Sequence, residues 1–157
     1  MLVLTDVGLA TFHEQVTKER SESTKHGATM EYIPPNYNLN TRAPTSRNFD
    51  QWSIGCIFLE FVIWVVYGWK AIIDFRNSRG ISSEGYQFFE LDQTVAKANR
   101  AVVSKLKEMR EDTQVHKNIA LTSLLNVIED KLIQVDQNQR ASAEELSEEL
   151  RAICSRI

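Results

Sequence analysis

The sequence predicts a mainly helical protein that begins with a short strand and a long loop. Two observations support this fold class. Residues 52–69, WSIGCIFLEFVIWVVYGW, form an apolar run with a single charged side chain, Glu60. From residue 95 onward, three segments repeat apolar side chains at the spacing of a helix that buries one face. Because each one-faced helix needs an apolar surface to cover it, we place the 52–69 run at the centre of a helical bundle.

The first 48 residues are expected to be mostly loop. Residues 2–4 are a short apolar run that stops at the turn formers Asp6 and Gly8, which predicts a strand followed by a turn. Residues 11–31 are polar and show no apolar period. Residues 32–48 contain three prolines and four asparagines, and proline lacks the backbone donor that a regular helix or a central strand requires.

The run at 52–69 has two interpretations, because about 20 apolar residues are long enough to cross a membrane. A membrane span would place Glu60 near the bilayer centre at a cost of a few kcal/mol, and it would leave the other apolar stripes without a common core. A helix enclosed by the other elements of a soluble protein meets neither difficulty. We therefore expect a protein-buried helix, with Glu60 paired or reaching solvent at the edge of the bundle.

Three further helices are expected to pack around this run. Their apolar positions are Val95, Ala98, Val102, Leu106 and Met109 in the first, Leu121, Leu124, Leu125, Ile128, Leu132 and Val135 in the second, and Leu146, Leu150, Ile153 and Ile157 in the third. Ser142 and Glu145 have the spacing of a capping box, in which each side chain accepts a hydrogen bond from the other residue's backbone amide. The last helix is therefore expected to begin just after Ser142.

Composition limits the classes of partner. The 157 residues are 43% hydrophobic and 25% charged, with a mean hydropathy of −0.30 and a formal net charge of −3. These values are typical of one soluble domain and give no broad basic field, so we expect neither a nucleic-acid nor a membrane partner. Cys56 and Cys154 lie far apart, and the N-terminus lacks the pattern of a secretory signal. An intracellular location, cytoplasmic or nuclear, is expected.

Two patterns resemble the ends of the activation segment of a protein kinase. LTDVGLA at 4–10 resembles the strand and D-F-G turn that open this segment, with Val7 in the place of phenylalanine. TMEYIPPN at 29–36 resembles the T-x-x-Y-x-A-P-E sequence that closes it, with Pro34 and Asn36 in the places of alanine and glutamate.

Two later patterns continue the resemblance in the same order as in a kinase C-terminal lobe. FDQWSIGCIFLEF at 49–61 is similar to the D-x-W-S-x-G-C-x-x-x-E helix, and DQNQRASAEEL at 136–146 is similar to the D-P-x-x-R-x-[ST]-x-x-E-L run before the last helix. The resemblance implies a single partial kinase domain over 1–157, with an activation-segment-like strand and loops at 1–48 and a helical bundle at 49–157. The aromatic-rich extension after LEF resembles kinase domains of filamentous fungi.

The resemblance also implies roles for individual residues. Asp6 would be a Mg²⁺ ligand beside Gly8, which has no side chain to obstruct a metal-bound phosphate; without the other motifs, Asp6 would be interpreted as a cap at a strand end. Thr29 would contact the catalytic aspartate and shape the substrate-binding loop, and it is otherwise a loop hydroxyl. Candidate phosphorylation sites near basic side chains of the same loop are Ser21, Ser23 and Thr24.

Three residues have structural roles by resemblance. Asp50 would accept hydrogen bonds from the backbone of the catalytic loop, and Arg140 would pair with the carboxylate that ends A-P-E. Because Asn36 occupies that last position, the expected contact is one to a neutral amide, roughly half as strong as a charge-assisted pair.

The sequence contains no G-x-G-x-x-G loop, no V-A-I-K lysine and no H-R-D-x-x-x-x-N loop, and the resemblance places these parts upstream of Met1. An intact parent would use Mg²⁺ and ATP to phosphorylate serine or threonine of protein substrates. The chain alone is expected to be catalytically incomplete, without tight ATP binding. The alternative is a non-catalytic, pseudokinase-type interaction module. Expected partners are protein substrates or an upstream N-lobe, and the isolated chain is expected to self-associate through apolar surface and an open strand edge.

Overall fold

The computed structural model describes residues 30–39, 48–80, 86–93 and 95–156. Of these residues, 73% are helical and 7% lie in strands, which confirms the mainly helical class. The strand predicted at 2–4 and most of the loop predicted at 11–31 lie outside the described residues.

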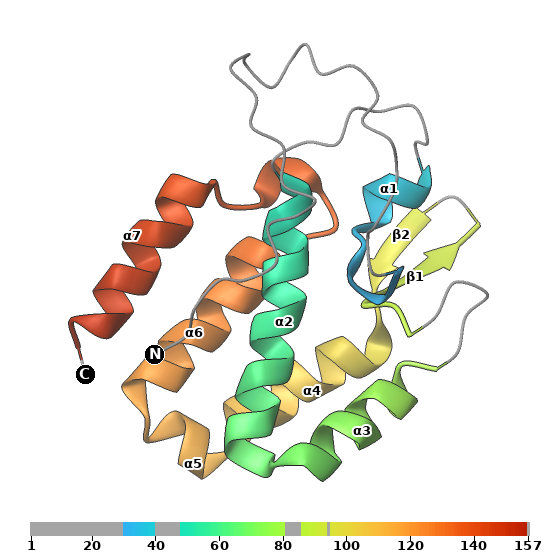
Figure 1. Ribbon diagram of the computed structural model, residues 1–157. Helices are drawn as coiled ribbons and strands as arrows, with labels where there is room; N and C mark the ends of the chain where they lie inside the picture. Colours follow the sequence, from blue (N-terminus) through green and yellow to red (C-terminus); the bar gives the residue numbers. More distant parts are fainter. Residues whose placement is uncertain (1–29, 40–47, 81–85, 94, 157) are drawn as a thin grey trace, which may run out of the picture.

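The elements follow one another along the chain as Figure 1 shows. A 3₁₀ turn η2 (Met30–Tyr32) and α1 (Pro35–Leu39) precede the helices α2 (Asn48–Tyr67) and α3 (Trp69–Ser78). A hairpin of β1 (Phe89–Asp92) and β2 (Val95–Ala98) follows. The remaining elements are α4 (Arg100–Glu111), α5 (Thr113–His116), α6 (Ile119–Val127), the π-helical turn η3 (Ile128–Leu132), the 3₁₀ turn η4 (Gln137–Gln139) and α7 (Ala143–Cys154).

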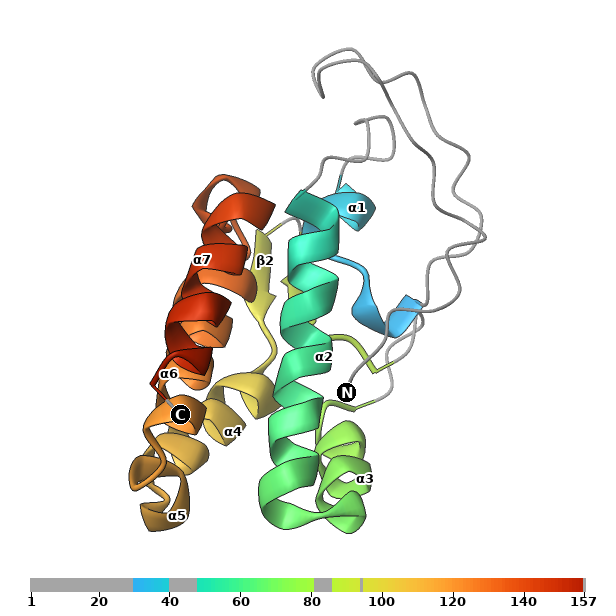
Figure 2. The ribbon, with the colours of Figure 1, turned by 60° about the vertical axis from the view of Figure 1, so that its left-hand side comes forward.

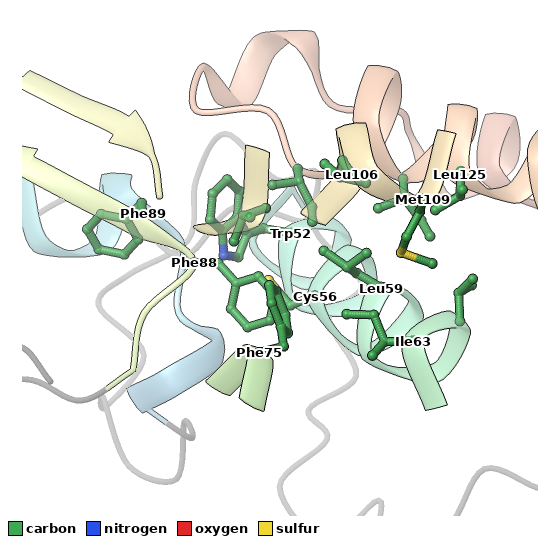
Figure 3. Close-up of a cluster of buried hydrophobic side chains, with 14 of the residues drawn as sticks. Trp52, Cys56, Leu59, Ile63, Phe75, Phe88, Phe89, Leu106, Met109 and Leu125 are labelled. Carbon is green, nitrogen blue, oxygen red and sulfur yellow. The ribbon is translucent and has the colours of Figure 1, made fainter. Parts of the chain in front are cut away.

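Helix α2 occupies the middle of the fold. In both Figure 1 and Figure 2 it runs between α6 and α7 on one side and α1 and α3 on the other. Figure 3 shows Trp52, Cys56, Leu59 and Ile63 pointing from α2 into one apolar cluster. Phe75, Phe88, Phe89, Leu106, Met109 and Leu125 join this cluster from α3, the hairpin, α4 and α6. The predicted central position of the 52–69 run is therefore observed.

Helix α2 lies close to the C-terminal part of the fold at Gly55. A Cβ atom at this position would lie 2.7 Å from the Cβ of Leu132 and 3.1 Å from Cγ1 of Ile133. The missing side chain thus allows α2 to pack directly on η3. A second, smaller apolar cluster of Val127, Leu132, Leu146 and Ile153 lies between α6, η3 and α7.

The prediction that protein would enclose the 52–69 run on all sides is wrong for one face. Ile57, Phe61, Trp64 and Val65 are exposed at i, i+4, i+7 and i+8 of α2, opposite the face that enters the core. Within the described part of the chain, α2 is the one helix long and apolar enough to span a membrane. Its other face fills the core, as in the central helix of a soluble protein.

One predicted loop and two predicted element boundaries are also wrong. Residues 35–39, predicted as loop, form the short helix α1, because Pro35 is its first residue and needs no backbone donor there. The 52–69 run is not one helix, because α2 ends at Tyr67 and Gly68, at φ 80°, turns the chain into α3. The helix predicted from Val95 begins only at Arg100. Residues 95–98 instead form β2, which pairs antiparallel with β1 from Phe89↔Ala98 to Asp92↔Val95. Asn99 sets the start of α4, because its side chain accepts a hydrogen bond from the amide of Ala101.

The other predicted apolar positions agree more closely with the structure. Val102, Leu106 and Met109 of α4 are buried, and so are Leu125, Ile128 and Leu132. The second predicted helix is regular only to Val127 and then widens into η3. The capping box of α7 is confirmed: Ser142 Oγ accepts from the Glu145 amide at 3.2 Å, and the Ser142 amide donates to Glu145 Oε2 at 2.7 Å. Ile157 lies outside the described residues.

We expect Ser142→Ala to lower the free energy of unfolding by about 1 kcal/mol, because the amide of Glu145 loses its acceptor. Urea unfolding followed by circular dichroism measures the change. Ser155→Ala, at the exposed end of the same helix, is the matched control and should change stability by only a few tenths of a kcal/mol. Equal midpoints for the Ser142→Ala variant and the unaltered chain would contradict the capping role.

Candidate functional site

Residues 30–39, which include most of the TMEYIPPN motif, are contacted at two places by buried arginines. Within this segment, Ile33 lies fully in the core, and Ser53 Oγ of α2 donates to the carbonyl of Tyr32 at 2.9 Å. Arg140 contacts the α1 end of this segment, and Arg79 contacts the η2 end. Each arginine is the centre of a cluster of side-chain contacts.

Arg140 holds three parts of the chain together. Its Nε donates to the carbonyl of Gln134 at 2.7 Å, its Nη1 to the carbonyl of Asn48 at 2.9 Å, and its Nη2 to Oδ1 of Asn36 at 3.2 Å. Its guanidinium carbon lies 5.1 Å from the centre of the Trp52 ring. The contact between Arg140 and Asn36, predicted by resemblance, is therefore confirmed across 104 positions of sequence.

Polar side chains around Arg140 complete this cluster. Asn36 Nδ2 donates to Oε1 of Gln137 at 3.2 Å, and Asn48 Nδ2 donates to the carbonyl of Gln137 at 2.8 Å. Asp136 caps the η4 turn by accepting from the amide of Asn138. The start of α1, the start of α2 and η4 are thus joined through side-chain amides.

The guanidinium group of Arg140 donates its hydrogen bonds to neutral oxygens. The residue is 5% exposed, and burial lowers its pKa to about 10. Among the residues that the structure describes, no carboxylate lies within ion-pair distance of its guanidinium. Carbonyl and amide oxygens therefore replace the water that this cation has lost, and the position with room for a carboxylate partner holds Asn36.

Arg79 forms the second cluster, with carboxylates on both sides. Its Nη2 pairs with Glu31 and, at 3.1 Å, with Oε1 of Glu60. Tyr32 donates its hydroxyl to Oε2 of Glu60 at 2.7 Å, and Arg76 pairs with the other oxygen of Glu31 at 3.2 Å. Burial, together with the bond to Glu60, raises the pKa of the Tyr32 hydroxyl. The expectation that Glu60 would be paired is confirmed.

Aromatic rings fix the Arg79 guanidinium in place. Its central carbon lies 4.5 Å from the centre of the Phe75 ring and 4.1 Å from that of Phe88, and the side chain is fully buried. Sequence reasoning required a partner for Glu60 but did not find Arg79 or Glu31. The sequence does contain one indication of Arg79: it lies at the C-terminal end of α3, where the helix dipole favours a cation.

A groove of about 410 Å³ lies beside the Arg79 cluster, between α2 and α3. Tyr32 and Glu60 form its polar end. The other lining residues are apolar: Ile57, Phe61, Trp64, Trp69 and Ile72. Because Glu60 already holds Arg79 and Tyr32, this groove presents mainly aromatic and aliphatic surface rather than a free acid or base.

Several predicted site residues cannot be placed. Asp6, Thr29 and the candidate phosphorylation sites Ser21, Ser23 and Thr24 lie outside the described residues. Asp50 is exposed in the first turn of α2.

Over the described ranges, no group of three His, Cys, Asp or Glu side chains is arranged to hold a metal ion. Cys56 is buried and its thiol pKa is raised by that burial, which disfavours the reactive thiolate.

Comparisons with protein-family models, curated protein sequences and solved structures find no match to this chain. The kinase resemblance therefore rests on the four sequence motifs.

We expect Asn36→Asp to raise the free energy of unfolding by about 1 kcal/mol at neutral pH, because a carboxylate would give Arg140 a charge-assisted bond. The side chain keeps its size, and the Gln137 amide can turn to offer its NH₂ group. The introduced carboxyl group, paired with Arg140, would have a folded-state pKa below its unfolded value. The gain is therefore complete above the unfolded pKa and is lost as the pH falls through the folded pKa.

Urea titrations at pH 7 and pH 3 measure this effect. Gln139→Glu is the matched control, since it adds the same charge next to Arg140 in sequence but on an exposed side chain. A gain of equal size in both variants, or a gain that persists at pH 3, would contradict a specific pair between the introduced carboxylate and Arg140.

We expect Arg79→Met to lower the free energy of unfolding by about 3 kcal/mol or more, because Glu31 and Glu60 would face each other without their shared cation. Glu60→Gln alone should cost only about 1–2 kcal/mol, since Arg79 keeps Glu31. In the Arg79→Met background, Glu60→Gln should restore part of the loss. Additive effects of the two changes in a double-mutant cycle would show that Arg79 and Glu60 do not act together.

Proposed function

We propose that this chain is the C-terminal lobe of a serine/threonine protein kinase-like protein, whose intact parent transfers the γ-phosphate of ATP to hydroxyls of protein substrates. The observation that carries the proposal is the bond between Arg140 and Asn36. The resemblance to the kinase motifs assigned these two residues to each other, although 104 positions separate them. Random similarity at each motif would not bring the two assigned positions into hydrogen-bonding contact.

The surroundings of this bond add support. The third motif lies on α2, the central helix, with Asp50 in its exposed first turn. The fourth motif ends in the capping box that starts the last helix. The three motif segments in the described residues therefore meet at one end of α2, as a shared ancestry with kinase C-lobes would require.

In the proposed function, phosphoryl transfer depends on positioning and on charge stabilisation rather than on covalent chemistry by the protein. Mg²⁺ would bridge the phosphates of ATP and neutralise developing charge, and Asp6 would be one of its ligands. Thr29 would orient the substrate loop. A phosphate on Ser21, Ser23 or Thr24 would order the loop by pairing with arginines. Partners would be protein substrates or an upstream N-lobe, in the cytoplasm or nucleus.

A non-catalytic interaction module is the second candidate. Asn36 favours it, because the neutral amide replaces the carboxylate that would tighten the segment of an active kinase. The apolar groove between α2 and α3 favours it as well, since it offers a binding surface without a free acid or base.

We expect the 157-residue chain alone not to bind Mg·ATP at micromolar concentration, because one aspartate cannot hold Mg²⁺ without further ligands and an ATP-binding lobe. Isothermal titration calorimetry measures the affinity, with Asp6→Ala as the matched variant. Micromolar binding that Asp6→Ala abolishes would overturn this prediction.

The reading frame upstream of Met1 tests the proposal itself. The kinase function requires an H-R-D-x-x-x-x-N loop there, and the protein expressed with that segment should transfer radiolabelled γ-phosphate to serine or threonine of a protein substrate. Asp6→Ala should abolish the transfer, while Ser142→Ala should leave it. Stop codons throughout the upstream frame, or an intact frame without transfer, would favour the interaction module.

A further inference from the structure

One side of α2 and the start of α3 expose large apolar side chains. We call this surface the α2–α3 apolar face; its exposed residues are Ile57, Phe61, Trp64, Val65, Trp69 and Ile73. Trp69 is 67% exposed and Trp64 is 50% exposed. Both line the groove between α2 and α3. These two helices join at Gly68, at the lower end of α2 in Figures 1 and 2.

The size of this face distinguishes it from scattered surface hydrophobics. Six large apolar side chains that are about half exposed present on the order of several hundred Å², at or above the largest patch of a typical monomer. A standard interface buries about 800 Å² on each partner, so this face could supply most of one. Such a face is a candidate site for another macromolecule.

The charges next to this face are self-complementary. Lys70 and Asp74 of α3 are exposed, carry opposite charges and lie one helical turn apart. Neither belongs to an ion pair within the described ranges of the chain. Trp69 and Ile73 repeat the same four-residue spacing on the adjoining apolar strip. A helix with this pattern matches its own antiparallel copy, because residue i meets residue j and residue j meets residue i.

We propose that the α2–α3 apolar face binds a second copy of this chain through a two-fold axis that crosses the exposed side of α3 at the level of residues 71 and 72. In this arrangement, the two α3 helices run antiparallel. Lys70 pairs with Asp74 of the second copy, and Trp69 packs against Ile73 of the second copy. The midpoints of these two pairs are residues 72 and 71, which lie about 1.5 Å apart along the helix. One axis between these two levels therefore leaves both pairs within reach of their side chains.

The groove borders the contact between Trp69 and Ile73, because Trp69 and Ile72 line it on the α3 side. Trp69 is the most exposed large apolar side chain among the described residues, and it stands at the rim of the groove. The rings of Phe61 and Trp64 in the groove lie 6.0 Å apart at 53° and hold each other in place. Aromatic side chains that are already ordered lose little entropy on binding, and buried aromatic anchors dominate interface affinity.

This inference goes beyond the proposed function and stands apart from it. It depends on side chains of the α2–α3 apolar face and not on Asp6, Asn36 or Arg140. A chain without phosphoryl transfer could still form the dimer, and an active kinase could be monomeric, so the two proposals fail independently.

Sedimentation velocity of the full 157-residue chain over a range of concentrations tests the dimer. We expect a monomer–dimer equilibrium with no larger species. Trp69→Ser should weaken it by at least about 30-fold, as for a central aromatic anchor. Ile119→Ser, at an exposed apolar residue of α6 outside the face, is the matched control and should leave the dissociation constant unchanged.

Charge exchange tests the two-fold arrangement. Lys70→Asp and Asp74→Lys should each weaken the dimer, because each places like charges opposite one another. The Lys70→Asp/Asp74→Lys double variant should restore it, and a mixture of the two single variants should form a heterodimer. Weakening without either rescue would overturn the proposed axis.

If the α2–α3 apolar face does not bind a second copy, these experiments give different results. A chain that is monomeric at all concentrations overturns the proposal. So does a monomer that sediments with vesicles of phosphatidylcholine and phosphatidylserine in a Trp69-dependent manner, which would assign the face to a lipid surface. Higher aggregates that are insensitive to Trp69→Ser and to charge exchange would overturn it as well.

Discussion

The guanidinium of Arg140 is buried against Trp52, and a buried cation destabilises a fold unless protein oxygens replace its lost water. Those oxygens come from the segment before η4, from the first residue of α2 and from α1. Three stretches that are distant in sequence must therefore arrive at the same place. The position of α1 follows from this requirement more than from its own five residues, which are too few to form a stable helix alone.

The two buried arginines that contact residues 30–39 differ in the groups that accept their hydrogen bonds. Arg79 is surrounded by two carboxylates and two aromatic rings, so its charge is neutralised locally. Arg140 has only neutral acceptors within the described residues. Hydrogen bonds between opposite charges are about twice as strong as those to neutral groups, so the η2 end of the segment is the more firmly held. If residues 30–39 move relative to the core, α1 should therefore move before η2.

The features that were predicted correctly from the sequence depend on local spacing or on the cost of leaving a charge unpaired in an apolar environment. The Ser142–Glu145 box is local, and Glu60 in an apolar run requires a partner wherever the chain supplies one. The features that it missed depend on competition between elements. Residues 95–98 fit the helical stripe of α4, but Asn99 is a strong cap and the backbone of β1 offers four ladder partners. Likewise, periodicity could not tell that the described elements leave one face of α2 uncovered. Arg79 was missed because its two carboxylate partners lie 19 and 48 positions away.

The contact at Gly55 also bears on how the molecule opens. With no Cβ between them, the backbone of α2 rests directly on Leu132 and Ile133, so there is no flexible side chain to absorb a shift of either element. A fluctuation that separates α6 and η3 from α2 must break this packing along a whole helical turn at once. Amide hydrogens in the middle of α2 and in η3 should consequently exchange with solvent as one cooperative unit. The amide of the exposed residue Gln93, which takes no part in this contact, should exchange by a separate and easier opening.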